Sequence, residues 1–379
     1  MADVDIGVGK SARRGYGLDE VTVVPSRRTR DADDVDLSWQ LDAYRLGLPM
    51  MAGASDAVVS PATAAAIGDL GGLAVLDLEG LWTRYDDPGP HLEALRHAPA
   101  GEVGGRLREL YRSPVRSELV SERIRALSAT GAITCGGVGP AHAAELGPTL
   151  LEADLDVLVV QGTVVSAEHV SRGGEPLDLR RFIRELDLPV LVGGCASYHA
   201  ALHLMRTGAV GVLVGTGLGG TRAVDQVLGV GVPDATAIAD AVGARTRHLE
   251  ETGVYVQVVA AGGVETSGDI AKALACGADA VMLGPCLAGA KEAPGGGRYW
   301  DATAAHPTLP HPTLSTTAPG GTLEELLVGP ARGTDGRTNL FGALRTTLGA
   351  CGYASIREFH KAEIVVAATG GEPARATRA

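Results

Sequence analysis

The stretch from Val258 to Ala290 places glycines where backbone N–H groups could bind an anion. An apolar run ends in Gly262-Gly263, a helix is expected to begin near Ser267, and a second apolar run ends in Gly284. Glycine lets the backbone approach a ligand closely, and the N-terminus of a helix attracts negative charge. The pattern therefore indicates a phosphate site. The alternative is that these glycines only close tight turns between strands and helices.

Thiol groups are the second source of possible chemistry, because a thiolate is a strong nucleophile. The chain has five cysteines: Cys135, Cys195, Cys276, Cys286 and Cys351. They are widely spaced and contain no C-x-x-C pair, which fits neither a disulfide framework nor a zinc site. Cys195 follows two glycines at an expected strand end, so we expect it, like Cys135, to face an active-site mouth. A buried, inert thiol is the alternative for both.

One structural unit recurs along the chain and must position these groups. It consists of an apolar strand that ends in small residues, a helix rich in Ala and Leu, and another apolar strand, and it occurs at residues 48–76, 131–160, 188–215 and 254–284. Continuous apolar strands are typical of parallel sheets covered on both faces. Four units carry eight strands, so we predict an α/β fold, a (β/α)8 TIM barrel, whose last two loops are the usual phosphate site. The absence of G-x-G-x-x-G after the first strand disfavours a Rossmann domain.

Three segments interrupt this repeat. Residues 1–46 form an N-terminal arm that we expect to close the bottom of the barrel, and residues 81–130 indicate an elongated helical connection. Residues 293–339 are rich in Gly, Pro and Thr, and a loop of that length usually serves a function. We expect it to be a flap or lid before the C-terminal helix. The whole chain, 1–379, is then one barrel domain.

Bulk composition limits the classes of partner. The net charge is −12, with no basic stripe, which argues against nucleic acid. The N-terminus lacks an apolar signal-like segment, and no stretch of 18 apolar residues occurs. We expect a cytoplasmic protein whose partners are small molecules, with no membrane contact.

The glycine-containing run resembles a known family. GGVETSGDIAKALACGADAVMLG, residues 262–284, is similar to the D-G-G-I-x-x-S-G-D-I-x-K-A-L-A-x-G-A-D-x-V-M-x-G run of IMP dehydrogenase and GMP reductase. Residues 16–41 and 344–359 are similar to that family's opening segment and C-terminal helix. Residues 81–130 are too short to hold the regulatory CBS pair of many dehydrogenases. The chain thus resembles the small, CBS-less IMP-dehydrogenase-related proteins of actinobacteria.

This resemblance implies an activity and its cofactor. In the family, a cysteine on a loop attacks C2 of a purine base, and hydride passes between the substrate and a nicotinamide cofactor; covalent catalysis splits one difficult step into two. The resemblance implies an oxidoreductase that acts on a purine nucleotide or nucleotide-like substrate with NAD or NADP. It also implies a homo-oligomer, a tetramer or octamer. Some FMN-dependent barrel oxidoreductases carry a similar run, so FMN is the minority alternative.

The family's cysteine loop has changed in this chain. The loop reads G-x-G-P-G-S-x-C-T-T-R in the family, and its counterpart is residues 215–225, at unchanged spacing to the following proline. Arg222 stands at the nucleophile position and Gly220 at the phosphate-binding serine. The ribose-binding aspartate is replaced by Ala261, and a second phosphate-binding serine by Pro285. The standard covalent mechanism therefore cannot run at Arg222, although its guanidinium could bind a phosphate or carboxylate. The alternative for Arg222 is a solvated loop side chain.

The remaining candidates follow from these correspondences. We expect Arg222 and, as a replacement nucleophile, Cys195 to be the catalytic residues. Asp56 lies at a strand end, and Gln161 stands where the family has a cofactor-side aspartate, so both are candidate cofactor ligands. We expect no metal. The glycines expected at the substrate phosphate are Gly217, Gly219, Gly220, Gly262, Gly263 and Gly284. An active enzyme would need another nucleophile or direct hydride transfer, and the alternative is a non-catalytic nucleotide-binding or regulatory paralogue.

Overall fold

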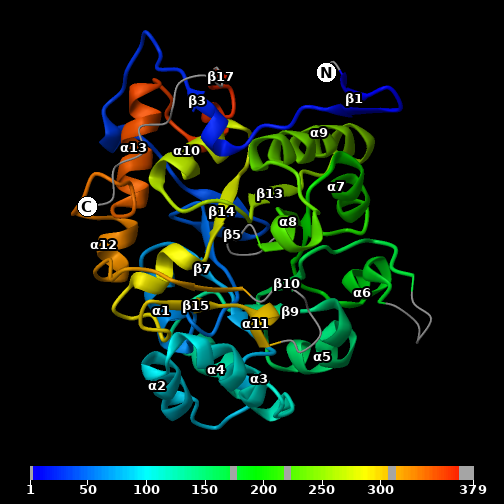
Figure 1. Ribbon diagram of the computed structural model, residues 1–379, viewed down its shortest axis with the longest axis vertical. Helices are drawn as coiled ribbons and strands as arrows, with labels where there is room; N and C mark the ends of the chain where they lie inside the picture. Colours follow the sequence, from blue (N-terminus) through cyan, green and yellow to red (C-terminus); the bar gives the residue numbers. More distant parts are fainter. Residues whose placement is uncertain (1–2, 171–176, 217–222, 306–312, 367–379) are drawn as a thin grey trace.

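The computed structural model describes residues 3–170, 177–216, 223–305 and 313–366, and its centre is a parallel sheet (Figure 1). Nine strands of the described chain lie in the order β7-β6-β14-β13-β12-β11-β10-β9-β8. Their bounds are β6 (Met50–Ala52), β7 (Leu73–Ala74), β8 (Leu76–Asp77), β9 (Cys135–Val138), β10 (Val157–Gln161), β11 (Val190–Cys195), β12 (Gly211–Val214), β13 (Gln257–Ala260) and β14 (Ala280–Leu283).

The sheet closes into a barrel at Val75. Only this residue separates β7 from β8, so the two are halves of one strand. The Val75 N–H donates to Ala52 O at 3.0 Å on one side, while Leu78 N–H donates to Gly137 O at 2.9 Å on the other. The predicted (β/α)8 barrel is therefore confirmed, with eight strands around the ring.

Helices surround the barrel and are capped by their own sequence signals. Thr266 accepts a hydrogen bond from Asp269 N–H, and the Asp269 carboxylate accepts one from Thr266 N–H. The cap of α10 is thus Thr266, one residue before the expected Ser267. The outer helices are α1 (Pro61–Asp69), α4 (Ser117–Ser128), α5 (Pro140–Glu152), α6 (Leu179–Glu185), α7 (Tyr198–Met205), α8 (Ala223–Leu228), α9 (Asp234–Thr252) and α10 (Ser267–Ala275). Two more, α2 (Gly89–His97) and α3 (Ala100–Leu110), extend the connection after β8, as predicted.

Two apolar layers hold this arrangement. Alternate strand residues point outward into a cluster shared with the helices, and the others fill the barrel interior, including Val159, Leu191 and Leu213. Trp39 and Leu46, from the hairpin of β4 (Trp39–Leu41) and β5 (Tyr44–Leu46), belong to the interior cluster. The N-terminal arm therefore closes the bottom of the barrel, as predicted.

The segment 293–339 is more ordered than the expected loop. Its strands β15 (Arg298–Trp300) and β16 (Leu314–Thr316) pair antiparallel, and it also contains α11 (Ala302–Ala305) and α12 (Leu323–Leu327). Pairing of β15 with β16 satisfies the hydrogen-bonding groups of their backbones. The Gly- and Pro-rich composition of the segment does not by itself predict this pairing. β15 and α11 lie across the barrel in Figure 1.

The termini pack beside this framework. The C-terminal part contains α13 (Leu340–Ala350), α14 (Ile356–Phe359) and β17 (Ile364–Val366), and β17 pairs with β3 (Val21–Val23). A hairpin of β1 (Asp3–Gly7) and β2 (Lys10–Arg13) projects from the opposite side of the same end (Figure 1). No helix in the described parts of the chain is long and apolar enough to span a bilayer.

Candidate active site at the barrel mouth

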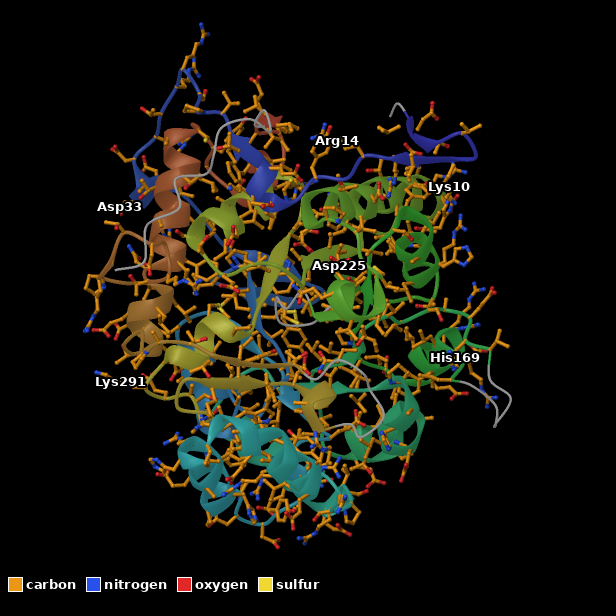
Figure 2. All side chains as sticks on the ribbon, in the orientation of Figure 1. Lys10, Arg14, Asp33, His169, Asp225 and Lys291 are labelled. Atoms are coloured by element: carbon orange, nitrogen blue, oxygen red, sulfur yellow. The ribbon has the colours of Figure 1, made fainter. Side chains whose placement is uncertain are left out.

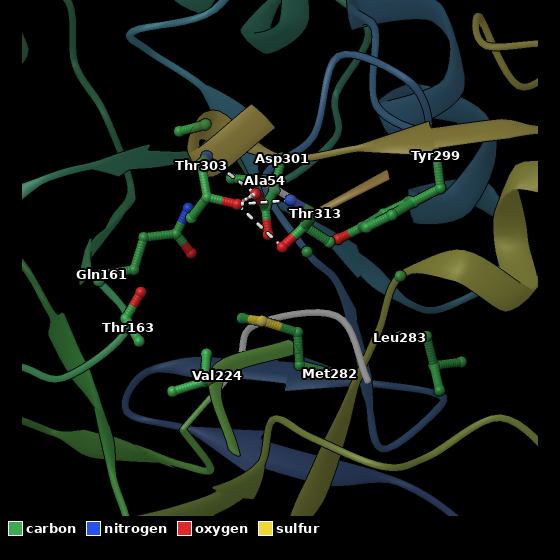
Figure 3. A pocket seen from close by; sticks show the side chains of 14 residues that line it. Ala54, Gln161, Thr163, Val224, Met282, Leu283, Tyr299, Asp301, Thr303 and Thr313 are labelled. Atoms are coloured by element: carbon green, nitrogen blue, oxygen red, sulfur yellow. Dashed lines mark hydrogen bonds between the residues drawn. The ribbon is translucent and has the colours of Figure 1, made fainter. Parts of the chain in front are cut away.

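A cavity of about 80 Å³, the mouth cavity, lies where strand ends meet the segment that follows β14. Its polar lining residues project from the end of β10 and from the β15–β16 region, and its apolar ones from the barrel and α8 (Figure 3). The carboxyl ends of barrel strands are where TIM-barrel active sites are built. The lining residues are Gly53, Ala54, Gln161, Gly162, Thr163, Val224, Met282, Leu283, Gly284, Tyr299, Asp301, Ala302, Thr303 and Thr313.

Gln161 and Asp301 supply the principal polar groups of the mouth cavity. Oε1 of Gln161 is a buried atom without a hydrogen-bond partner in the described chain. The Asp301 side chain is 9% exposed, and its Oδ1 accepts a hydrogen bond from Thr303 N–H at 2.9 Å. Burial raises the pKa of Asp301 to about 6, against the opposing effect of its hydrogen bonds to Thr303. The cavity therefore holds an acceptor without a donor and a carboxyl group that titrates near neutrality.

A second and wider cavity, the acidic cavity, adjoins the first at Val224 and has a volume of about 610 Å³. No Lys or Arg is among the described residues that line either cavity. One of its carboxylates, Asp225, projects from α8 in Figure 2. The acidic residues of this lining are Asp19, Glu20, Asp225, Asp234, Glu265 and Asp269.

The expected phosphate glycines are divided between the two cavities. Gly262 and Gly263 line the acidic cavity, whereas Gly284 lines the mouth cavity. Gly263 has φ +63°, and a Cβ there would collide with the Asp234 carboxylate. Only glycine fits this position. Phosphate binding by these glycines stays a prediction, as it does for Gly217, Gly219, Gly220 and Arg222, which lie outside the described residues.

The thiols expected at the mouth lie elsewhere. Cys195 is 1% exposed and belongs to the cluster between barrel and helices, and burial raises the pKa of its thiol to about 12. Cys135 points into the barrel interior and pairs with Val157 at the start of β10, away from the carboxyl ends of the strands. Burial also raises the pKa of its thiol. The expectation that both face the mouth is wrong, because β11 turns Cys195 outward and Cys135 begins its strand rather than ending it. Neither thiol lines either cavity.

Asp56 supports the fold beside the site and lines neither cavity. Its side chain is completely buried, and Oδ2 accepts hydrogen bonds from Leu81 N–H at 2.7 Å and from the Tyr111 hydroxyl. Burial raises the pKa of Asp56 to about 6. The two candidate cofactor residues are therefore separated. Gln161 lines the mouth cavity, whereas the Asp56 side chain contacts Leu81 and Tyr111 in the connection after β8.

The sequence did not single out the polar residues that the segment 293–339 brings to the mouth. Tyr299, Asp301, Thr303 and Thr313 all line the mouth cavity, and the Thr303 and Thr313 hydroxyl oxygens lie 2.8 Å apart. The length of the segment indicated a lid, but which of its residues face the barrel depends on the β15–β16 pairing. In the described residues, no group of three or more His, Cys, Asp or Glu side chains is arranged to hold a metal ion.

Comparison with known proteins identifies related chains. The model of the IMP dehydrogenase / GMP reductase domain matches residues 15–305. An uncharacterized oxidoreductase of Mycobacterium leprae is 48% identical over 372 residues, which make up 96% of this chain and 99% of that protein. The inosine-5'-monophosphate dehydrogenase of Methanocaldococcus jannaschii is 30% identical over 269 residues, 63% of this chain and 52% of that enzyme.

A solved structure agrees with these sequence matches. The crystal structure of an IMP dehydrogenase/GMP reductase-like protein from Corynebacterium glutamicum has a TM-score of 0.91 and 43% sequence identity to this chain. The match covers 96% of this chain and 97% of that one. The similarity therefore extends over the arm, the barrel and the segment after β14.

Proposed function

Because the chain belongs to the IMP dehydrogenase / GMP reductase family, we propose that it is an oxidoreductase that acts on a purine nucleotide or nucleotide-like substrate with a nicotinamide cofactor. The observation that carries the proposal is the mouth cavity, which is lined both by Gln161, from the end of β10, and by the buried Asp301, from the segment after β14. Buried polar groups in a concave site at this end of a barrel are the usual mark of an active site.

The chemistry would proceed without a protein thiol. Arg222 stands at the family's nucleophile position, and no cysteine is among the described residues that line the cavities. When bound, a nicotinamide cofactor supplies a hydride acceptor or donor, which does not itself require a covalent bond to the protein. The mouth cavity would orient the ring, and in place of the thiol a water molecule would add to the ring carbon that gives up the hydride. Asp301, with its pKa near 6, could accept the proton that this addition releases.

The charge of the acidic cavity bears on the cofactor. Carboxylates accept hydrogen bonds from ribose hydroxyls but repel an additional phosphate, and the same contrast separates NAD sites from NADP sites in other folds. Gln161, with its unpartnered oxygen in the mouth cavity, fits a cofactor amide N–H. We therefore propose NAD rather than NADP, with the ribose-bearing part of a ligand over the acidic cavity. FMN stays the minority alternative.

Absorbance of reduced nicotinamide tests the proposal. The full chain is mixed with NAD or NADH, and in parallel with NADP or NADPH, together with IMP, XMP, GMP or a nucleoside. We expect turnover with a purine ligand and a preference for NAD over NADP of about tenfold or more, because the carboxylates of the acidic cavity would repel the additional phosphate of NADP. A yellow protein with flavin absorbance, or no purine turnover and no purine binding, would contradict the proposal.

A non-catalytic paralogue is the second candidate, favoured by the missing cysteine at Arg222. It predicts that a purine nucleotide raises the melting temperature of the protein without any change in nicotinamide absorbance. A ligand that binds only the folded state stabilises it in proportion to the logarithm of its concentration over Kd once the ligand is in excess. Melting and absorbance measured on the same preparation therefore separate the two functions.

A further inference from the structure

The residues of β15 and the one that follows it face two different parts of the molecule, because side chains alternate between the faces of a strand. Tyr299 and Asp301 line the mouth cavity. Arg298 and Trp300 contact the helices α2 and α3 instead. These helices lie below β15 and α11 in Figure 1. The position of the cavity-lining face therefore depends on what holds the opposite face.

Trp300 anchors β15 in an apolar cluster of the two helices. Its side chain is 1% exposed, and Ala304 and Ala305 of α11 belong to the same cluster. An aromatic side chain of this kind buries about 150–250 Å², so the contact holds β15 and α11 to the helices. The buried residues that α2 and α3 contribute to the cluster are Leu92, Leu95, Val103 and Leu107.

Two arginines join the same elements, one from each side. Arg96 on α2 donates through Nε to Pro294 O at 2.7 Å and through Nη2 to Ala293 O at 3.2 Å. Arg298 on β15 donates in return to the carbonyl oxygen of Ala98, the residue after α2. A guanidinium holds its donors in a rigid fork, so Arg96 can fix two neighbouring carbonyl groups at once.

The turn before β15 is shaped to receive Arg96. Gly296 in this turn has φ +58°, in the left-handed region that favours glycine, and a Cβ there would lie 3.1 Å from Cδ of Arg96. On the barrel side, the Gly295 N–H donates to Ala57 O at 2.8 Å. The turn is therefore held between the loop after β6 and the arginine.

We propose that α2 and α3 form a clasp that holds residues 293–305, the mouth segment, in place before any ligand binds. Arg96 and Trp300 are then positioning residues, because they act on the mouth cavity through β15. A segment that is ordered in advance loses less conformational entropy when a ligand binds. The clasp itself does not depend on which ligand binds, whereas its effect on ligand affinity rests on the proposed function.

Hydrogen–deuterium exchange of the full, ligand-free chain tests the clasp. Arg96→Ala is expected to speed exchange in peptides of the mouth segment about 10- to 100-fold, because it removes two charged hydrogen bonds. Arg96→Lys should give a smaller increase, since an ammonium group can still donate but lacks the fork. Peptides that contain β10 and β13 should exchange as they do in the wild type.

Arg106→Ala is the matched control. Arg106 lies on α3 with a side chain that is 45% exposed, and it pairs with Glu102 of the same helix. The Arg96 side chain is 36% exposed and likewise pairs with Glu93 of its own helix. The control removes a partly exposed arginine and its helix ion pair but leaves the hydrogen bonds of Arg96 in place. Exchange of the mouth segment should therefore not change.

Titration with the purine nucleotides IMP and GMP tests the positioning role separately. In Arg96→Ala/Trp300→Ala both the anchor and the fork are lost, so we expect the mouth segment to be mostly detached in the ligand-free protein. The apparent Kd is inversely proportional to the fraction of molecules whose segment is in place, and we expect it to rise about tenfold or more. Melting curves and the exchange of the barrel peptides show whether the variant is folded.

The possible failures are distinguishable. Unchanged exchange of the mouth segment in Arg96→Ala, or an equal increase in the barrel peptides, overturns the clasp. A double variant that binds purine nucleotides as tightly as the wild type, although its mouth segment exchanges rapidly, overturns the positioning role. If the wild type binds no purine nucleotide, the proposed function is wrong, while the exchange measurements still decide whether the clasp exists.

Discussion

At the scale of single residues, the reactivity of the cysteine thiols tests most directly whether this protein uses a thiol nucleophile. Burial raises the pKa of Cys195, Cys276 and Cys286, so each is protonated at neutral pH. A buried protonated thiol is a poor nucleophile. We therefore assign these side chains to packing.

Native protein should react slowly with a thiol reagent such as Ellman's reagent, and denatured protein should release the signal of all five cysteines. Cys195→Ala should leave purine binding and turnover unchanged, with a loss of stability of about 1–2 kcal/mol from the small cavity that it creates. Rapid modification of one native thiol together with loss of turnover in Cys195→Ala would restore the replacement-nucleophile hypothesis.

Arg222 belongs to the same scale and is tested by comparing ligands that differ only in phosphate. If its guanidinium binds the substrate phosphate, Arg222→Ala should weaken IMP binding about tenfold or more and leave inosine binding unchanged. Arg332, which forms an ion pair with Glu325 away from both cavities, is a suitable control as Arg332→Ala. If Arg222→Ala changes the affinities for IMP and inosine equally, Arg222 does not bind the substrate phosphate.

At the scale of elements, β8 ends in a buried carboxyl group, that of Asp77. Asp77 is 5% exposed, and burial, followed by the nearby charges of Asp56 and Glu79, raises its pKa well above the usual range. A carboxyl whose pKa is raised on folding stabilises the folded state most at low pH, and that contribution is lost as the pH rises from the unfolded-state pKa to the folded-state pKa. The buried carboxylate at the end of β8 therefore lowers the stability of the folded state at neutral pH.

Asp77→Asn should remove part of this cost. The variant is expected to unfold with a free energy about 1–3 kcal/mol higher than the wild type at pH 8, and to lose that advantage near pH 4, where the Asp77 carboxyl of the folded wild type is protonated. Urea unfolding at several pH values measures the difference. Asp33→Asn, at an exposed position, should show no such pH-dependent gain. A destabilised Asp77→Asn at pH 8 would contradict a raised pKa for this carboxyl.

The sequence predicted the elements that depend on a local pattern of residues. It did not predict the side-chain directions and segment positions that depend on tertiary pairing of strands. The strand–helix repeats could be predicted, because a strand that is buried on both faces is a continuous apolar run. The N-terminal arm that contains Trp39 could also be predicted to close the barrel. The direction of Cys195 could not, since it depends on the register irregularity between Gly193 and Cys195 in β11. Asp301 was missed for a related reason: only the pairing of β15 with β16 carries its segment to the strand ends.

At the scale of the whole molecule, the projecting hairpin bears on assembly. Its residues Val4, Ile6 and Val8 are exposed apolar side chains on a two-stranded ribbon, which is marginally stable alone in water. We predict from the family resemblance that the chain forms a tetramer or octamer. Sedimentation of the full chain should show one of these masses, and deletion of residues 3–13 should reduce the mass if the hairpin contributes. A monomer at micromolar concentration would contradict this prediction.

The central claim is that a purine ligand binds at the barrel mouth, between the end of β10 and the β15–α11 segment. Hydrogen–deuterium exchange of the full chain, measured with and without saturating GMP and NAD, tests it directly. We predict slower exchange in peptides that contain residues 161–165 and 298–305, with little change in α2 and α3. Unchanged exchange in both mouth peptides, with protection elsewhere or nowhere, would contradict the claim.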